Sequence, residues 1–177
     1  MPTPPTFVTG AVLTAAQMNT IGMFLVKSQT IGTAVSSVTV TGAFSADYDN
    51  YKIVYTGGSG SAVNNLQLLL GSTTTGYYGF GTYGATTATT VLGINDNNAA
   101  RFGYIGGGGS YGEVAHIDVY NPFATAQTQV SAVITVATNF GFYAGRLDNT
   151  TSYTAFTLRP DTGTLTGGTI RVYGYRN

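Results

Sequence analysis

Cysteine and tryptophan are missing from this 177-residue chain, histidine occurs once, and charged side chains make up only 8% of the residues. Without cysteine the chain has no disulfide, no thiolate nucleophile and no cysteine-ligated zinc. Seven basic and seven acidic residues give a formal net charge of +0, and no segment concentrates Lys or Arg. Nucleic-acid binding relies on clustered positive charge, so we do not expect nucleic acid as a partner.

Long apolar runs are also missing. The longest apolar stretch near the N-terminus covers residues 21–26, which is far too short to span a membrane. The first residues lack a basic segment followed by an apolar run, so neither membrane insertion nor a secretory signal is expected. A neutral surface also lacks the charge repulsion that keeps monomers apart, so the composition tolerates assembly.

The chain is rich in residues that favour strands and turns. It has 25 Gly, 13 Tyr and 9 Phe, threonine is abundant, and hydrophobic residues make up 43%. This content allows a core, and the length fits one domain with a short appendage. Threonine and aromatic residues favour strands, whereas glycine favours turns. The composition therefore predicts β-structure.

Apolar and polar residues alternate with period two from about residue 31 onward, which is typical of half-buried strands. The clearest alternations cover residues 51–55, 115–119, 130–136, 156–158 and 170–172, and further strands are expected at 35–41, 63–70, 77–83 and 100–105. Turn residues separate them at 57–60, 95–98, 106–109, 121–122 and 161–163. The pattern predicts an all-β fold, an antiparallel two-sheet sandwich of the jelly-roll type over residues 31–177.

Residues 1–30 differ from the rest and are interpreted as a docking arm. Three prolines at positions 2, 4 and 5 favour an extended lead. Thr14 and Gln17 have the spacing of a capping box, which predicts a short helix over about 15–21. Such a helix is too short to be stable alone, so it must pack either on its own domain or on another subunit. Leu13, Thr14, Gln17 and Met18 are the expected docking residues.

Three segments resemble a known group of proteins. Residues 10–19, Gly-Ala-Val-Leu-Thr-Ala-Ala-Gln-Met-Asn, resemble the opening of many tailed-bacteriophage structural proteins. Residues 47–55, with Tyr48, Tyr51 and Ile53, resemble a strand found early in these domains. Residues 166–174, with Gly167-Gly168 before an alternating strand, resemble their closing strand. The resemblance covers the two ends of the chain and leaves about 60–160 unmatched.

The resemblance implies a virion structural protein of the tail-fibre, minor virion or capsid-decoration type. Such a protein has a jelly-roll-like domain and is often a homotrimer. The implied location is the virion, assembled in the host cytoplasm, and the implied partners are other capsid or tail proteins. The resemblance supplies no catalytic residues and does not distinguish tail from capsid.

Few residues offer catalytic or metal-binding chemistry. His116 and Asp118 share a strand face, but no sequence context marks a Ser or Thr as their nucleophile. Asp47, Asp49 and the polar run 95–98 lack the ligand spacing of a calcium loop, and turn chemistry explains them. Glycoside hydrolysis usually needs paired carboxylates, and none stands in a recognisable setting. We therefore predict no enzymatic activity, no metal site and no cofactor.

The aromatic clusters are the remaining candidates for a site. Tyr77, Tyr78, Tyr83 and Tyr143 lie in dense groups of aromatic residues and glycines. Tyrosine rings stack on sugars and are enriched at subunit interfaces, but they also pack cores. Core or interface packing is the preferred interpretation. The alternative is a receptor-binding module that recognises a host surface polysaccharide through these rings.

Overall fold

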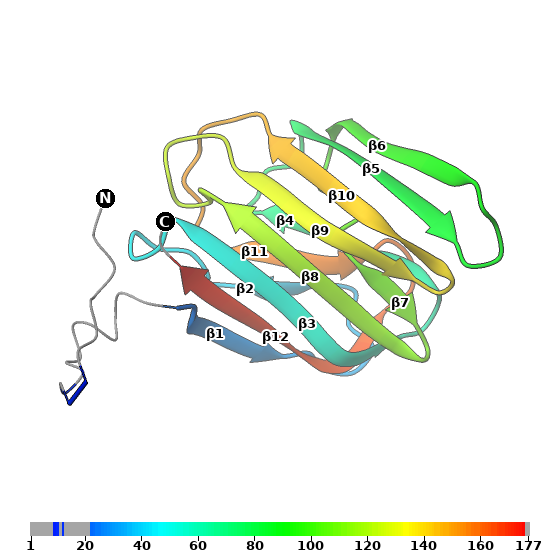
Figure 1. The fold of residues 1–177 in the computed structure, drawn as a ribbon, viewed down its shortest axis with the longest axis horizontal. Helices are drawn as coiled ribbons and strands as arrows, with labels where there is room; N and C mark the ends of the chain where they lie inside the picture. Colours follow the sequence, from blue (N-terminus) through cyan, green and yellow to red (C-terminus); the bar gives the residue numbers. More distant parts are fainter. Residues whose placement is uncertain (1–8, 11, 13–21, 176–177) are drawn as a thin grey trace.

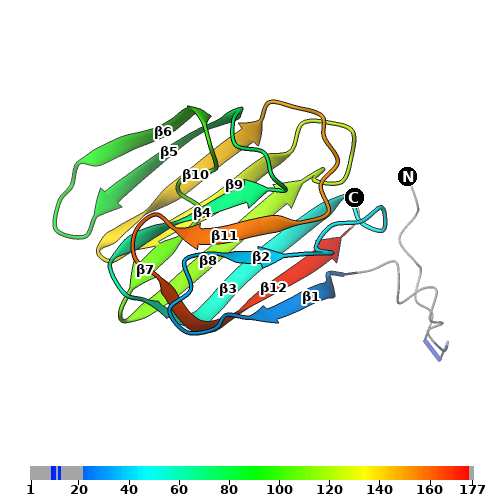
Figure 2. The ribbon, with the colours of Figure 1, turned by 180° about the vertical axis from the view of Figure 1, so that it is seen from behind.

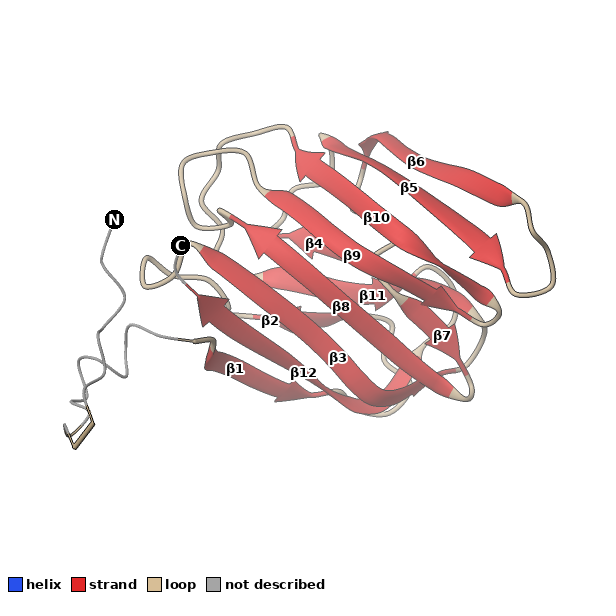
Figure 3. Ribbon diagram, in the orientation of Figure 1, coloured by secondary structure: helices blue, strands red, loops and turns tan. Residues whose placement is uncertain are grey.

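The computed structural model describes residues 9–10, 12 and 22–175, and Figure 3 shows strands and loops but no helix among them. The strands are β1 (Phe24–Thr30), β2 (Val38–Val40), β3 (Asn50–Gly60), β4 (Asn64–Leu70), β5 (Tyr77–Ala85), β6 (Val91–Ala99), β7 (Gly107–Gly109), β8 (Gly112–Tyr120), β9 (Gln129–Val136), β10 (Asn139–Leu147), β11 (Phe156–Pro160) and β12 (Leu165–Tyr175). The prediction of an all-β chain is confirmed. The predicted helix over 15–21 lies outside the described residues.

Every strand pairing is antiparallel, and the strands form a curled sheet with two facing layers. The wide layer has the order β1-β12-β3-β8-β9-β10-β5-β6. The narrow layer has the order β2-β11-β4, and Figures 1 and 2 show it lying against one face of the wide layer. The short strand β7 pairs with both β4 and β8, so hydrogen bonding continues from one layer into the other.

The core lies between the two layers. Along β3, Tyr51, Ile53 and Tyr55 are fully buried, whereas Lys52 and Val54 between them are half-buried. Strand β4 of the narrow layer contributes Leu66, Leu68 and Leu70, which are also 0% exposed. The same alternation of buried and more exposed residues recurs in β8, β9, β11 and β12. Period-two alternation thus defines an inner and an outer face of the wide layer.

Strands β10, β5 and β6 extend the wide layer beyond the narrow one (Figure 1). Asp96 of β6 ties the loop between β6 and β7 to this extension. One carboxylate oxygen of Asp96 accepts hydrogen bonds from the Tyr143 hydroxyl, at 2.6 Å, and from the Gly103 backbone amide, at 2.8 Å. The outer face of the extension has no covering element among the described residues.

The predicted boundary between arm and body at residue 30 is wrong. Strand β1 runs from Phe24 to Thr30 and pairs with β12 along its length, so these residues belong to the sheet. A register shift between Leu25 and Lys27 interrupts the alternation. A bulge moves the side chains that follow it to the other face of the sheet, so the period-two pattern is interrupted and does not predict this strand.

Several predicted turns are also wrong, because they lie inside strands. The run 95–98 lies within β6, and only Asn98 has the left-handed φ, +50°, that its composition suggests. Residues 57–60 end β3, where a bulge places Gly58 opposite Glu113, and Gly107–Gly109 form β7. The expected strand over 100–105 reduces to one bridge between Phe102 and Leu68. The turns at 121–122 and 161–163 are confirmed.

Candidate functional site

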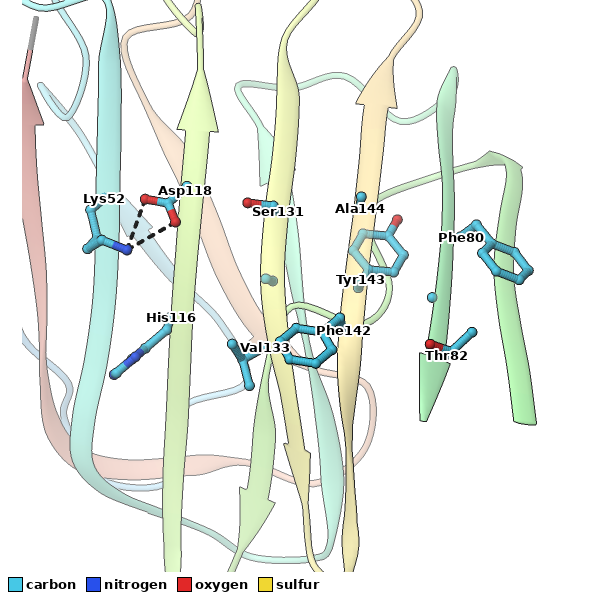
Figure 4. Close-up of a pocket in the computed structure, with 12 residues that line it drawn as sticks. Lys52, Phe80, Thr82, His116, Asp118, Ser131, Val133, Phe142, Tyr143 and Ala144 are labelled. Carbon is cyan, nitrogen blue, oxygen red and sulfur yellow. Dashed lines mark hydrogen bonds and ion pairs between the residues drawn. The ribbon is translucent and has the colours of Figure 1, made fainter. Parts of the chain in front are cut away.

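A groove of about 560 Å³ crosses the outer face of the wide layer (Figure 4). Its lining comes from β3, β8, β9, β10 and β5, so it runs from the body into the extension. This volume falls in the usual range for sites of small molecules.

Strand register produces the row of side chains that forms the groove. Lys52 lies opposite Asp118, Asp118 opposite Ser131, Ser131 opposite Ala144, and Ala144 opposite Phe80. Directly paired residues project from the same face of an antiparallel sheet. The sequence therefore places a polar group at one end of this row, two small side chains in its middle and an aromatic ring at its other end.

The small residues make the floor, and larger side chains form the walls. Ser131 and Ala144 leave a hollow that a larger residue at either position would fill. Phe80 at one end is 61% exposed. Phe142, two residues before Ala144 on β10, is 72% exposed and forms a wall beside Val133 (Figure 4). These three walls present apolar surface to solvent.

An ion pair forms the polar end. The Lys52 ammonium lies 2.9 Å from one oxygen of the Asp118 carboxylate and 3.0 Å from the other. Both side chains are about 30% exposed, so the pair adds only about 0–1 kcal/mol to the free energy of unfolding. Its main effect is to fix the carboxylate in place beside the floor, with its charge balanced by that of Lys52.

His116 lines the same groove but does not engage Asp118. Both Asp118 oxygens contact Lys52, and Figure 4 shows the imidazole pointing away from the carboxylate. The two residues share the outer face of β8, as predicted. The described residues contain no group of three or more His, Asp or Glu that is close enough to hold a metal ion.

Two of the four predicted aromatic residues are buried, so the hypothesis that they stack on a glycan is wrong for them. Tyr77 is 0% exposed; its hydroxyl accepts from the Leu70 amide and donates to the Thr73 carbonyl. Tyr143 is 2% exposed, and its hydroxyl donates to Asp96. Burial raises the pKa of Tyr77 to about 12. Both rings are buried on the inner face of the wide layer, in agreement with the preferred interpretation of core packing.

The other two predicted tyrosines lie on opposite faces of β5. Tyr78 is half-buried on the outer face, where the Arg146 guanidinium lies over its ring at 5.9 Å from the centroid. Tyr83 is half-buried on the inner face and lines a smaller hollow of about 230 Å³ with Tyr104 and Ile94. The four tyrosines therefore do not form one site. The predicted docking residues Leu13, Thr14, Gln17 and Met18 lie outside the described residues.

The residues that sequence reasoning missed are Phe80 and Phe142. Both lie within the aromatic clusters of residues 77–83 and 140–143: Phe142 directly precedes Tyr143, and Phe80 is two residues after Tyr78. Alternation requires Phe142 and Tyr143 to face opposite ways, but it does not decide which faces solvent. That choice depends on which face the narrow layer covers.

Comparison with known proteins places no constraint on this site. No protein-family model matches the chain, and neither the curated proteins nor the solved structures contain a match to it. Across the described residues there is also no helix long and apolar enough to cross a membrane.

Proposed function

We propose that this chain is a non-enzymatic structural protein of a tailed-bacteriophage virion, acting as a fibre, adaptor or capsid-decoration module. The observation that carries the proposal is the nested order of strand pairing. Strand β1 pairs with β12, β2 with β11, β3 with β8 and β4 with β7. This is the pairing produced when one long antiparallel hairpin is wound into two sheets, as in a jelly roll, a fold that recurs in viral capsid proteins.

The two inserted hairpins account for the remaining strands. Strands β5 and β6 are inserted between β4 and β7, and β9 and β10 between β8 and β11. All of them extend the layer that contains β1, β12, β3 and β8. Removing them leaves the order β1-β12-β3-β8 facing β2-β11-β4-β7, which supports a jelly roll with one enlarged sheet.

The N-terminal segment before β1 is the proposed docking arm. The resemblance of residues 10–19 to the opening of phage structural proteins supports this role. Because β1 begins at Phe24, the proposed arm ends at about residue 23. Other virion proteins are the proposed partners, and the virion is the proposed location. Tail and capsid attachment are equally compatible with this arrangement.

We further propose that the domain self-associates. A trimer is the proposed state, because the phage structural proteins that the chain resembles are often homotrimers. Strand β6 supports self-association, because among the described strands it pairs only with β5. Native edge strands are usually protected by Lys, Pro or short length. Strand β6 has nine residues without Lys or Pro, and its exposed residues include Val91, 70% exposed, and Leu92, 48% exposed.

Light scattering on the isolated chain tests the oligomer. We expect a Val91→Lys variant to dissociate, because a lysine on an edge strand blocks pairing with another edge. Val63→Lys is the matched control, since Val63 is 59% exposed in the turn before β4. A wild-type chain that stays monomeric at high concentration contradicts the proposal.

Mass spectrometry of purified particles tests the virion role. Particles from an induced lysate of a bacterium carrying the encoding phage are banded on a density gradient. We expect peptides of this chain to band with the major capsid protein in a fixed ratio. A chain that stays in the soluble fraction, away from the particles, refutes the structural role.

A second candidate function is recognition of a host surface glycan. Of the four tyrosines predicted for this role, Tyr77 and Tyr143 are buried. The groove with Phe80 and Phe142 supports glycan recognition at a different place. Such a role is compatible with a structural one, because a docked module can present the groove outward.

A further inference from the structure

We infer that the outer-face groove binds a neutral saccharide, with Phe80 and Phe142 against the apolar faces of its rings and Asp118 accepting hydrogen bonds from its hydroxyl groups. This inference rests on the second candidate function, glycan recognition, and names its site and ligand class. It is independent of how the chain is attached to a particle.

The apolar side of the groove is built from two exposed rings. Phe80 and Phe142 are 61% and 72% exposed, although both lie in the middle of strands. Phe80 pairs with Ala144 and Phe142 with Thr82, so the two rings are diagonal neighbours about 7 Å apart. A single exposed Phe is ordinary, whereas two exposed rings around one hollow give a ligand a contiguous apolar surface to contact. Pyranose rings have apolar C–H faces that suit such walls.

The polar side supplies groups that match hydroxyls. Asp118 offers carboxylate oxygens that lie beside Lys52, and the Ser131 hydroxyl on the floor both donates and accepts. Hydrogen bonds to a charged partner are the stronger kind. Because Lys52 neutralises Asp118, the groove attracts neither anions nor cations as such. A ligand with many neutral hydroxyl groups meets these requirements.

The dimensions suit a short oligosaccharide. Asp118 and Phe80 are separated by three strand spacings, or about 14 Å. That length accommodates more than one sugar ring, with the rings against phenylalanine at one end and the hydroxyls near the ion pair at the other. The groove is open to solvent, so we expect weak binding, with Kd between about 1 μM and 1 mM.

A second copy of the chain fits this groove less well. Taking about 200 Å² for a fully exposed Phe, the exposed parts of Phe80, Phe142 and Val133 amount to about 300 Å². A stable interface buries about 800 Å² on each partner. An ion pair at one end of the patch also opposes its use as the centre of a subunit interface, where charged residues are depleted.

The test begins with the full chain on an array of neutral and acidic bacterial oligosaccharides. The best neutral binder is then titrated into isotope-labelled protein and followed by amide NMR shifts. We expect shifts centred on Ser131, Ala144 and Thr82, with Kd in the range given above. Failure of every neutral oligosaccharide to bind overturns the inference and removes the second candidate function, but leaves the virion role to its own test on particles.

Variants place the binding in the groove. We expect Phe142→Ala to weaken binding about tenfold by removing a stacking wall, and Asp118→Asn to weaken it at least as much by removing the carboxylate. Phe140→Ala is the matched control, because Phe140 is 50% exposed on the same face of β10 but does not line the groove. Amide spectra establish that each variant is folded.

Two results count against the groove specifically. If Phe142→Ala and Asp118→Asn bind the oligosaccharide as the wild type does, glycan recognition stands but its site lies elsewhere. If Phe142→Ala instead converts an oligomer into monomers in light scattering while Phe140→Ala does not, the groove is an interface between copies and the inference is wrong.

Discussion

The buried carboxyl of Glu113 predicts an unusual dependence of stability on pH. Glu113 lies on the inner face of β8 and is 1% exposed. The Asn64 side-chain amide donates to one carboxyl oxygen at 2.6 Å, and the other oxygen has no hydrogen-bond partner among the described residues. Burial raises the pKa of Glu113 from 4.5 to about 7; the bond from Asn64 lowers this pKa, and the charge of Asp161 raises it further.

The direction of the effect follows from proton binding. Between the unfolded pKa of 4.5 and the folded pKa of about 7, the native state holds a proton that the unfolded state has released. The free energy of unfolding therefore falls as pH rises through this window, by up to about 1.4 kcal/mol per pH unit. The full shift corresponds to about 3 kcal/mol. Because part of this shift is realised below pH 5, the loss expected between pH 5 and pH 8 is about 2 kcal/mol.

Urea unfolding of wild type and Glu113→Gln measures this effect. Glutamine keeps the oxygen that accepts from Asn64 but does not titrate. From about pH 5 to about pH 8 we expect the wild type to lose about 2 kcal/mol, whereas the variant changes little over this interval. His116→Gln, a change at an exposed position of the same strand, is the matched control and is expected to keep the wild-type slope. A flat wild-type profile, or an unchanged slope in Glu113→Gln, refutes the reasoning.

Three further predictions concern the fold and the arm. A Cβ at Gly79 would lie against the Tyr143 hydroxyl, so Gly79→Ala should lower the free energy of unfolding by about 3 kcal/mol. Gly93→Ala is the control, because a Cβ there would make only ordinary contacts and should change the free energy of unfolding by less than about 1 kcal/mol; thermal melts compare the two variants. Tyr143→Phe removes the hydrogen bond to Asp96 and should cost about 1–3 kcal/mol in urea unfolding, and full stability in the variant would contradict that role. Deleting residues 1–22 should leave a folded β domain by circular dichroism and abolish incorporation into particles, and normal incorporation of this variant would contradict the docking arm. A deletion that extends through β1 should also destabilise the domain.

Sequence patterns located the central strands because burial there follows strict alternation. In β3 one face is covered by the narrow layer, where Tyr51, Ile53 and Tyr55 are buried, and the other face is open to solvent. The alternation of apolar and polar residues therefore identifies the strand and its buried face. Strand β6 carries no such information, since most of it is exposed on both faces and its polar run 95–98 resembles a turn. In β1 the bulge after Leu25 breaks the period.

The groove could not be predicted from local sequence, because it depends on which strands become neighbours. Ser131 and Ala144 are unremarkable small residues until β9 and β10 place them side by side between Asp118 and Phe80. The pairing of β10 with β5 joins two inserted hairpins that are far apart in the chain. Alternation gives the two faces of each strand, but register and neighbours are tertiary information.

The nested pairing also sets an order of assembly for the chain itself. Closing a loop costs more entropy as the loop lengthens, so β4 with β7 and the local hairpins are expected to form before β1 meets β12. Strand β1 directly follows the N-terminal segment, so that segment becomes anchored to the sheet only when the rest of the domain is in place. A particle that captured the chain through its N-terminus together with the β1 edge would thereby discriminate completed domains from unfinished ones.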